Sequence, residues 1–499
     1  MSITGIGGRS GLQIQSLVEM RRQLDDLQRQ LGTGKKADSY AGLGLARGLT
    51  IGLRGQLAAI GSFDHTITVL GARLSVAQTV LGQLDELGHA VKRMSVTSTF
   101  VIDQSGQTAD QRTALGYLDQ MIGALQVRVG DQYLFSGKSP DQPPVAGTSQ
   151  ILDGQGARAG LRQIIAERAA ADLGDGLGRL VIPAPAAATV SVSEDAASPF
   201  GLKLAAVAST LTGAIVTGPA GDPASLSIDL GAATLADGDA IRISFDLPDG
   251  TSEDLTLVAT TAASAGPGQF TIGATADATA ANLQAALAAA VGTLAETSLS
   301  AASALAAAND FFNIDDANAP RRVAGPPFEA ATALLAGTSA DTVFWYTGEA
   351  GSDAARMSAL ARVDASVTVS CGLRANEPAI RGALANCAVF AALTFSPSDA
   401  NGSARYAALA RRVAANLDEP PGTQKISDIG AEIANAQTTM NAAKERHQQT
   451  VTALGNLLQS LEGVPTEEVG AQILALQTRL QATLQTTALL ARTNLVDFL

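Results

Sequence analysis

The sequence predicts a mainly α-helical protein. Long helices from both termini would form antiparallel, coiled-coil-like pairs, accompanied by small β-hairpin elements and an inserted α+β domain. Leucines recur at spacings of three and four over both ends of the 499-residue chain, which is the period of an amphipathic helix. Between the ends, apolar and polar residues alternate on either side of a Pro-Asp-Gly sequence, which is typical of a β-hairpin. Only 4% of the residues are aromatic, so we expect long apolar seams to stabilise the fold.

The first predicted helix lies in the segment LVEMRRQLDDLQRQL and presents one apolar face. It ends in LGTGKKADSYAG (31–42), where Gly34-Lys35 superficially matches a phosphate-binding loop. That motif requires an earlier glycine where this chain has Arg29, and a Ser or Thr where it has Lys36. We therefore interpret the stretch as a helix end, where glycines and cations are favoured, followed by a turn. The apolar face consists of Leu17, Met20, Leu24, Leu27 and Leu31.

Further long helices follow the same spacing. In the N-terminal half of the chain they run from about residue 53 to 94 and from about residue 108 to 129. Near the C-terminus, a single seam runs over about five heptads, from 426 to 461, and Gly463 and Pro465 then interrupt it. Apolar spacing sustained over this length favours coiled-coil packing, and such a seam needs a partner.

The last predicted helix begins at Thr466, a capping residue that is followed by two acidic residues in the first turn. We expect its apolar face to pack against the face of the first helix. These two faces together form the predicted assembly interface. The residues that the last helix contributes are Ile473, Leu476, Leu480, Leu484 and Leu490.

The middle of the chain changes character and predicts an α+β domain. Strands are expected at 224–230 and on both sides of the Pro-Asp-Gly turn at 248–250, and a helix is expected after residue 277. Beyond this segment, alternating apolar residues from Val363 to Cys371 predict a strand pair. A further helix is expected after Pro378.

These patterns divide the chain into five predicted segments. An N-terminal assembly helix (1–45) precedes the N-terminal half of a helical core (46–150). An inserted variable α+β domain (185–335) comes before the C-terminal half of the core with its β-hairpin (340–460). A C-terminal assembly helix (461–499) ends the chain.

No catalytic, cofactor-binding or metal-ligating set is predicted. Cys371 and Cys387 have neither C-x-x-C spacing nor a nearby histidine, so we expect two small buried residues, while a disulfide between them stays open. His65, His89 and His447 lie on helical stretches, and His447 occupies a seam position. We expect structural histidines there.

Charge and targeting signals narrow the function further. Asp249, Glu253 and Asp254 surround the predicted turn, and we interpret them as solvated turn residues rather than as an acid–base pair. A net charge of −13 argues against nucleic acid as the main partner. The N-terminus lacks the pattern of a cleaved signal peptide, and we expect no membrane span.

Several of these stretches together resemble the bacterial flagellin family, and within it the hook-associated proteins of the hook–filament junction. The resembling segments are QRQLGTGKKADSYAGLG at the exit of the first helix, DQYLFSGKSPDQPPV (131–145), VFWYTGEAG, VTVSCGLRANEPAI and the terminal heptads ending in LVDFL. They fall within residues 1–150 and 340–499. The insert at 185–335 is not covered.

The resemblance implies an extracellular structural protein of the flagellum that serves motility and joins hook to filament. It implies export through the flagellar type III channel without a cleaved signal peptide, with the help of an export chaperone. Its partners would be copies of itself in a tubular lattice, another hook-associated protein and flagellin subunits. No cofactor is implied. The terminal segments would gain their stability from packing in the assembly.

Alternatives remain open at this stage. A filament-forming flagellin fits the same family, and the large insert would suit an exposed filament surface. An enzyme carried in the inserted domain belongs to another class, but the sequence presents no carboxylate pair, triad or metal cluster there. A coiled-coil tether such as a chemoreceptor would need a transmembrane span.

Overall fold

The computed structural model describes residues 5–315, 317–349 and 351–496, without the side chains of 5–10, 13 and 490–496. The chain divides into two compact units. The first unit comprises residues 1–70, 362–368 and 438–499, and the second comprises residues 71–361 and 369–437.

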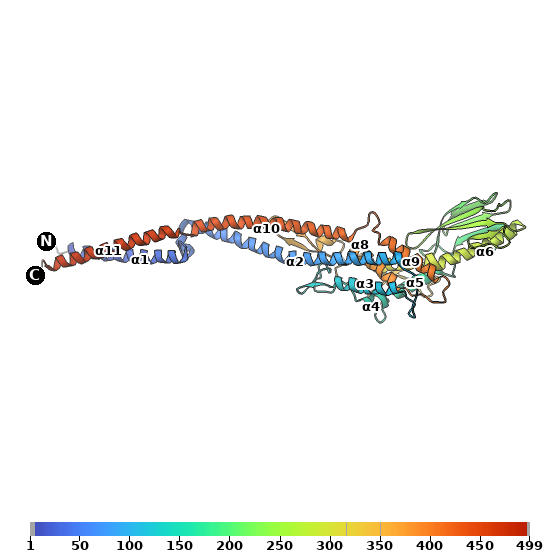
Figure 1. The fold of residues 1–499 in the computed structure, drawn as a ribbon, viewed down its shortest axis with the longest axis horizontal. Coiled ribbons are helices and arrows are strands. Elements are labelled where there is room, and N and C mark those ends of the chain that lie inside the picture. The colour runs from blue at the N-terminus through green and yellow to red at the C-terminus, as the bar shows by residue number, and fades with distance from the viewer. Residues whose placement is uncertain (1–4, 316, 350, 497–499) are drawn as a thin grey trace. The chain divides into compact units, whose positions relative to one another are not determined.

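The first unit is built from long helices that break at two places. It contains α1 (Gly5–Thr33), the short 3₁₀ helix η1 (Tyr40–Ala46) and α11 (Thr466–Val496). It also holds the first portion of α2 (Arg47–Thr97) and the last portion of α10 (Ile426–Glu462). Helices α1 and α11 pack against each other, and they run in opposite directions (Figure 1).

The long helices predicted from apolar spacing are confirmed. The periodic segments that begin near residues 17, 53, 426 and 466 lie within α1, α2, α10 and α11. Gly463 and Pro465 do separate α10 from α11, as expected. The stretch LGTGKKADSYAG does end a helix, because α1 stops at Thr33 and Gly34 adopts φ +66°.

The second unit contains the shorter helices. They are α3 (Ala109–Leu125), α4 (Thr148–Asp153), α5 (Leu161–Leu173), α8 (Pro378–Ala392) and α9 (Gly402–Asn416). Thr108 begins α3 with a capping box, in which its side chain accepts the Gln111 N–H and its own N–H donates to the Gln111 side chain. Pro378 stands in the first turn of α8, as predicted. The short 3₁₀ helix η3 (Ala355–Ser358) precedes α8 in the chain.

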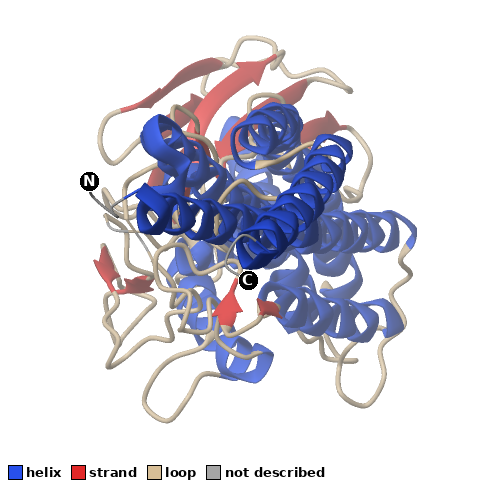
Figure 2. Ribbon diagram, turned by 90° about the vertical axis from the view of Figure 1, so that its left-hand side faces the viewer, coloured by secondary structure: helices blue, strands red, loops and turns tan. Residues whose placement is uncertain are grey.

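Two four-stranded sheets form the β-rich portion of the second unit (Figure 2). One has the order β3–β4–β7–β6 and is antiparallel throughout, with β3 (Leu180–Val181), β4 (Thr189–Glu194), β6 (Ile215–Ala220) and β7 (Ser225–Asp229). The other has the order β10–β9–β8–β5, with β5 (Lys203–Ser209), β8 (Ala240–Asp246), β9 (Ser252–Thr260) and β10 (Gln269–Thr271). Only its β10–β9 pair is parallel.

A continuous apolar core joins these sheets to helix α6 (Ala276–Leu294). Its members range from Leu180 to Ala302, and α6 packs on β4, β9 and β10. A π-helical turn, η2 (Ala295–Leu299), links α6 to α7 (Ser300–Phe312). The predicted hairpin, the strand at 224–230 and the helix after 277 are confirmed as β8–β9, β7 and α6.

Short strand pairs complete the fold. They are β1 (Arg128–Val129) with β2 (Gln132–Tyr133), β11 (Arg321–Val323) with β12 (Leu334–Ala336), and β13 (Leu360–Arg362) with β14 (Thr368–Ser370). A strand pair therefore forms in this part of the chain as expected, but of the four alternating residues from Val363 to Cys371 only Val369 lies in a strand.

One expectation is wrong. The helix predicted to run to residue 129 ends at Leu125, because Gly130 adopts φ +63° and turns the chain back as the β1–β2 hairpin. Residues 276–312 form one helical run that is long and apolar enough to cross a membrane by length and composition alone, and the expectation of no membrane span stays a prediction. In this structure Leu283, Leu287 and Val291 of that run belong to the apolar core of the sheets.

Candidate assembly surface

The predicted interface largely coincides with the packed faces of α1 and α11. On α11, Ile473 and Leu476 are each 8% exposed and Leu480 is partly buried. On α1, the partly buried apolar residues are Leu17, Met20, Leu24 and Leu27. Seven of the ten predicted residues therefore lie on inward sides of the two helices.

The remaining three predicted residues differ. Leu31 is 42% exposed and Leu484 is 49% exposed, and the side chain of Leu490 lies outside the described residues. Beyond Leu480, the partly buried positions of α11 are Thr483 and Thr487, which continue the three/four spacing. Sequence reasoning followed the leucines and missed these threonines, although the spacing itself pointed to them.

Hydrogen bonds join the break that follows α1 to the break between α10 and α11. The Lys36 N–H donates to the Glu462 carbonyl at 2.7 Å, and the Val464 N–H donates to the Gly34 carbonyl at 3.1 Å. The Lys36 Nζ also donates to the carbonyls of Ser460 and Leu461 at the end of α10. A cation at this site satisfies carbonyls that have no partner within the helix and interacts favourably with the helix dipole.

An ion pair beside these breaks adds a second link. Arg54 on α2 donates to both carboxylate oxygens of Glu462, at 2.9 and 2.6 Å. The guanidinium also lies 5.7 Å from the centre of the Tyr40 ring. The pair holds η1 and α2 to the end of α10, within the first unit.

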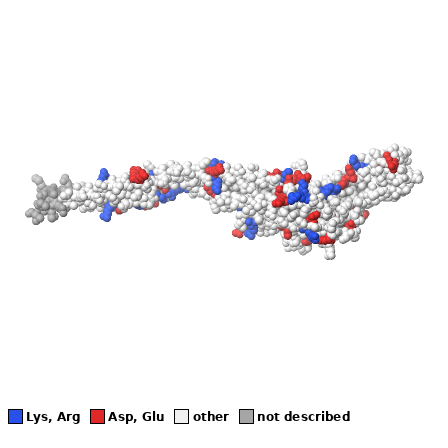
Figure 3. Space-filling view, viewed as in Figure 1, with Lys and Arg blue, Asp and Glu red and all other residues white. Residues whose placement is uncertain are grey.

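Many apolar side chains of the first unit face solvent. On α1 and α11 they include Leu12, Ile14, Val18, Leu474, Leu484 and Leu489, with exposures between 46% and 67%. Leu45 in η1 is fully exposed. Charged side chains are sparse on the drawn face of these two helices (Figure 3). Exposed apolar side chains that gather on one part of a molecule are characteristic of a surface that another molecule covers.

His447 is buried in the first unit, as expected of a structural histidine. It is 4% exposed, and its ring stacks on Phe63 with the ring centres 6.0 Å apart. Its Nδ1 lies 2.7 Å from Asp64 on α2, and its Nε2 lies 3.8 Å from Asp364. The pKa of Asp364 is lowered, mainly because its carboxylate accepts a hydrogen bond from the Ala365 N–H. Arg446 and His447 lower it further. No sequence pattern pointed to these carboxylate partners.

Three stretches that carry the family resemblance meet in the second unit. The Ala146 N–H donates to the Trp345 carbonyl at 2.8 Å, and the Thr347 N–H donates to the Pro144 carbonyl at 2.9 Å. The segment 131–146 thus pairs with 345–349. The Ala375 N–H donates in turn to the Phe135 carbonyl at 2.9 Å, which adds the third stretch.

A glycine and an ionic cluster stabilise this meeting point. A Cβ on Gly137, which has φ +63°, would lie 2.5 Å from the Glu349 carboxylate, so only glycine fits. Glu349 pairs with Lys138 and with the buried Arg374, each at 3.1 Å. Although burial raises the pKa of Glu349, hydrogen bonds from Lys138 and the charge of Arg374 outweigh it and lower the pKa overall.

The interpretation of the hairpin acids as solvated is wrong for Asp249. Its side chain is 4% exposed and accepts a hydrogen bond from Arg412 Nε at 3.1 Å. Arg412 on α9 also pairs with Glu253 at 3.0 Å. Two acidic residues of the hairpin therefore neutralise a buried arginine.

The cysteines behave as the sequence suggests. Cys371 and Cys387 are both buried and free, so the disulfide that the sequence left open is not formed. Burial raises the pKa of Cys387 to about 12 and also raises that of Cys371. Both thiols are therefore protonated and unreactive at neutral pH.

Comparisons with known proteins add no family assignment. No protein-family model matches this chain, and no curated protein matches it at a significant level.

Proposed function

We propose that this protein is a structural subunit of the bacterial flagellum, a member of the flagellin family that joins hook to filament. The proposal extends to a coiled-coil-like pairing of the terminal helices, to an extracellular location and to type III export without a cleaved signal peptide. Its partners would be further copies of the chain in a tubular lattice, another hook-associated protein, flagellin and an export chaperone.

The observation that carries the proposal is the exposed apolar surface of α1 and α11. These helices bury one apolar face against each other, while leucines on their outward sides stay exposed. At about 25 cal/mol per Å² of apolar area, covering several such side chains supplies a favourable free energy of assembly. In a tubular lattice, neighbouring copies would cover them.

The meeting of the three resembling stretches in the second unit supports the same family. Backbone groups of residues 131–146 hydrogen-bond both to 345–349 and to 373–375, although these segments are far apart in the sequence. Stretches that resemble one family and form one local structure support the resemblance more strongly than any one of them alone.

A filament flagellin is the second candidate. The segment from Leu180 to Ala302 has its own apolar core, so it can form a large outward domain of the kind that a filament surface accommodates. An enzyme carried in this segment has less support, because two acidic residues of its hairpin, Asp249 and Glu253, pair with Arg412.

Gold labelling of an inserted epitope separates the candidates. The loop at 262–268 is exposed throughout, so an epitope there should not disturb the core. In cells that produce the tagged protein, label in one band at the end of the hook is the expected result. Label along the whole filament would replace the junction role by that of a flagellin, and label away from flagella would contradict both.

A further inference from the structure

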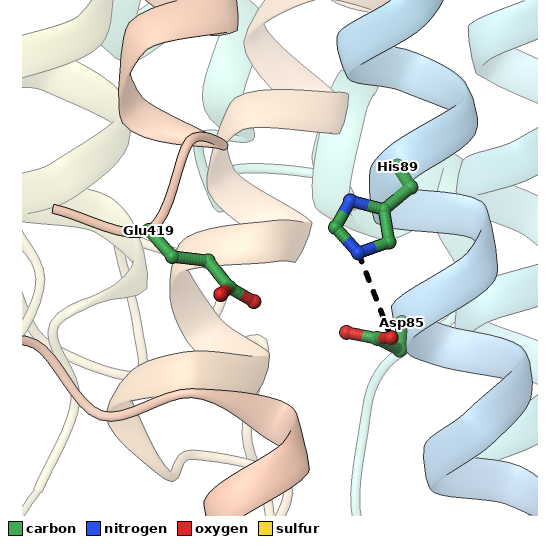
Figure 4. Close-up of side chains that lie close together, drawn as sticks. All are labelled: Asp85, His89 and Glu419. Atoms are coloured by element: carbon green, nitrogen blue, oxygen red, sulfur yellow. Dashed lines mark ion pairs between the residues drawn. The ribbon is translucent and has the colours of Figure 1, made fainter.

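A histidine and two carboxylates of the second unit face one another across a short gap. Asp85 and His89 stand four residues apart on α2, so both project from one face of the helix. His89 Nε2 lies 3.7 Å from Asp85 Oδ2. Glu419, from the loop after α9, points its carboxylate toward both (Figure 4). One ligand atom from each residue lies within 4.8 Å of the other two.

The three side chains line a cavity rather than a flat surface. Its volume is about 510 Å³. The side chains of His89, Asp85 and Glu419 are 46%, 36% and 32% exposed, so an ion can reach them from solvent. The remaining lining includes the amide side chains of Asn309, Asn386 and Asn416. The cavity therefore has room for an ion together with water molecules that complete its coordination.

The donor set selects one class of ion. An imidazole nitrogen favours Zn²⁺ and neighbouring transition metals, whereas Mg²⁺ and Ca²⁺ prefer oxygen donors alone. Tetrahedral Zn²⁺ with bonds of about 2.0–2.2 Å separates its ligand atoms by roughly 3.4 Å. The 3.7 Å between His89 Nε2 and Asp85 Oδ2 is close to that separation.

We propose that Asp85, His89 and Glu419 form a binding site for a divalent transition-metal ion of the Zn²⁺ class. Each side chain gives one ligand, and water supplies the rest. Lys425 pairs with Glu419 at 2.9 Å. A carboxylate has two oxygens and about four lone pairs, so Glu419 keeps Lys425 while it also binds the ion.

The ion would fix the loop between α9 and α10 to helix α2. Residues 417–425 and the α2 residues are more than 300 positions apart, and in the described residues an exposed Lys92–Asp418 ion pair also joins them. Exposed ion pairs contribute little stability, whereas a shared metal ion ties its ligands firmly. The site would thus act as a metal-dependent clasp within the second unit. This role does not rest on the flagellar proposal.

Calorimetric titration of the metal-free full-length protein with Zn²⁺ tests the site. The wild type should bind one ion, and both His89→Gln and Glu419→Gln should weaken binding at least about tenfold. His65→Gln is the matched control, because His65 is an exposed histidine of the same helix outside the cluster. That variant should bind as the wild type does. Binding should also weaken as the pH falls, because protons compete for the ligands.

Amide hydrogen exchange supplies a second measurement that identifies the loop. Zn²⁺ should slow exchange of residues 417–425 in the wild type and in His65→Gln, but not in His89→Gln. Fluorescence of Trp345, the single tryptophan, checks that each variant keeps the second unit folded. Absence of Zn²⁺ binding, equal binding by all variants, or Mg²⁺ binding as tight as that of Zn²⁺ would overturn the proposal.

Discussion

The two units differ in which side chains they expose and which they bury. Among the described residues, two thirds of the exposed large hydrophobic side chains belong to the first unit, although it holds fewer than a third of the residues. The second unit instead buries charged residues, among them Glu167, Arg168, Asp172, Glu377 and Arg412. The first unit leaves apolar area for other molecules to cover, and the second satisfies its own polar groups inside its core.

The difference also teaches which interactions matter for stability in each unit. Buried charges of the second unit are costly unless they are paired, so the removal of one partner is strongly destabilising. Ion pairs of the first unit are more exposed and contribute little. The stability of the first unit therefore depends on the apolar contacts of its helices, and assembly would add to them.

The largest effect is expected from charge on the inner face of α11. Leu476→Asp combined with Leu480→Asp should abolish incorporation into the flagellum, because burying two carboxylates against α1 costs far more than the pairing gains. Ala262→Asp combined with Ser264→Asp is the control, since both residues lie in the exposed loop at 262–268, away from α1 and α11, and the added charge is the same. Immunoblots of purified flagella measure incorporation, and normal incorporation of the leucine variant would refute the role of this face.

A comparison of two arginines tests the second half of the contrast. Arg412→Met should cost about 3–5 kcal/mol of unfolding free energy, because it leaves Asp249 buried without its partner. Arg446→Met should cost less than about 1 kcal/mol, because Arg446 is 53% exposed and its partner Asp364 is 25% exposed. Denaturant unfolding followed by Trp345 fluorescence reports the first effect, and hydrogen exchange of residues 438–462 reports the second. If both variants lost the same unfolding free energy, burial of the ion pair would not explain its contribution to stability.

Acidification should affect the units differently. Burial raises the pKa of Asp172 and of Asp310, which share Arg168. The folded state then binds protons that the unfolded state releases, so this contribution to stability rises as the pH falls toward the usual carboxyl pKa of 3.8. As the pH falls, the free energy of unfolding of the wild type should therefore rise relative to that of Asp172→Asn, by up to about 1.4 kcal/mol per pH unit. Denaturant unfolding of both proteins, followed by Trp345 fluorescence between pH 7 and 4.5, measures this difference.

Asp364 provides the opposite case in the first unit. Its pKa is lowered, so its contribution is complete above pH 3.8 and is lost only as the pH falls through the lower, folded value. The difference between wild type and Asp364→Asn should stay constant between pH 7 and 4.5, as judged by hydrogen exchange of residues 438–462. For the second unit, the contradicting result is a wild type that becomes less stable than Asp172→Asn on acidification, because the pKa of Asp172 would then be lowered and not raised.

The smallest effect concerns the turn that resembles a phosphate loop. Lys36→Met removes two hydrogen bonds to the end of α10 and a favourable charge, which costs roughly 0.3–1 kcal/mol. Faster amide exchange at residues 460–464 is the expected result. Lys35→Met is the control, because no hydrogen bond from the Lys35 side chain is found among the described residues. Equal acceleration in both variants would speak against the cap.

The long helices could be predicted from their apolar periodicity. Helices without such a period could not be predicted from the sequence. Helix α5 buries Glu167, Arg168 and Asp172, so polar residues occupy positions that a pattern search expects to be apolar. Helix α7 is buried on nearly all sides and has no polar face to reveal its period. The contacts of Asp249 with Arg412 join residues 163 positions apart, and no local pattern encodes them.

The assembly surface was only partly predictable for the same reason. Spacing identified the inward leucines of α1 and α11, but hydrophobicity favoured Leu484 over Thr483 and Thr487. Each stretch that resembles the flagellin family was visible in the sequence. Their meeting around Gly137 and Glu349 was not, because it depends on the fold of the second unit as a whole.

Hydrogen exchange of the free and the assembled protein tests the central claim most directly. If neighbouring copies cover α1 and α11, then residues 12–33 and 466–489 should exchange rapidly in the free protein and become strongly protected in the assembly. Residues 109–125 and 378–392, in α3 and α8, should be protected in both states. Equal protection of the terminal helices before and after assembly would contradict the account, because their exposed apolar side chains would then have no role in it.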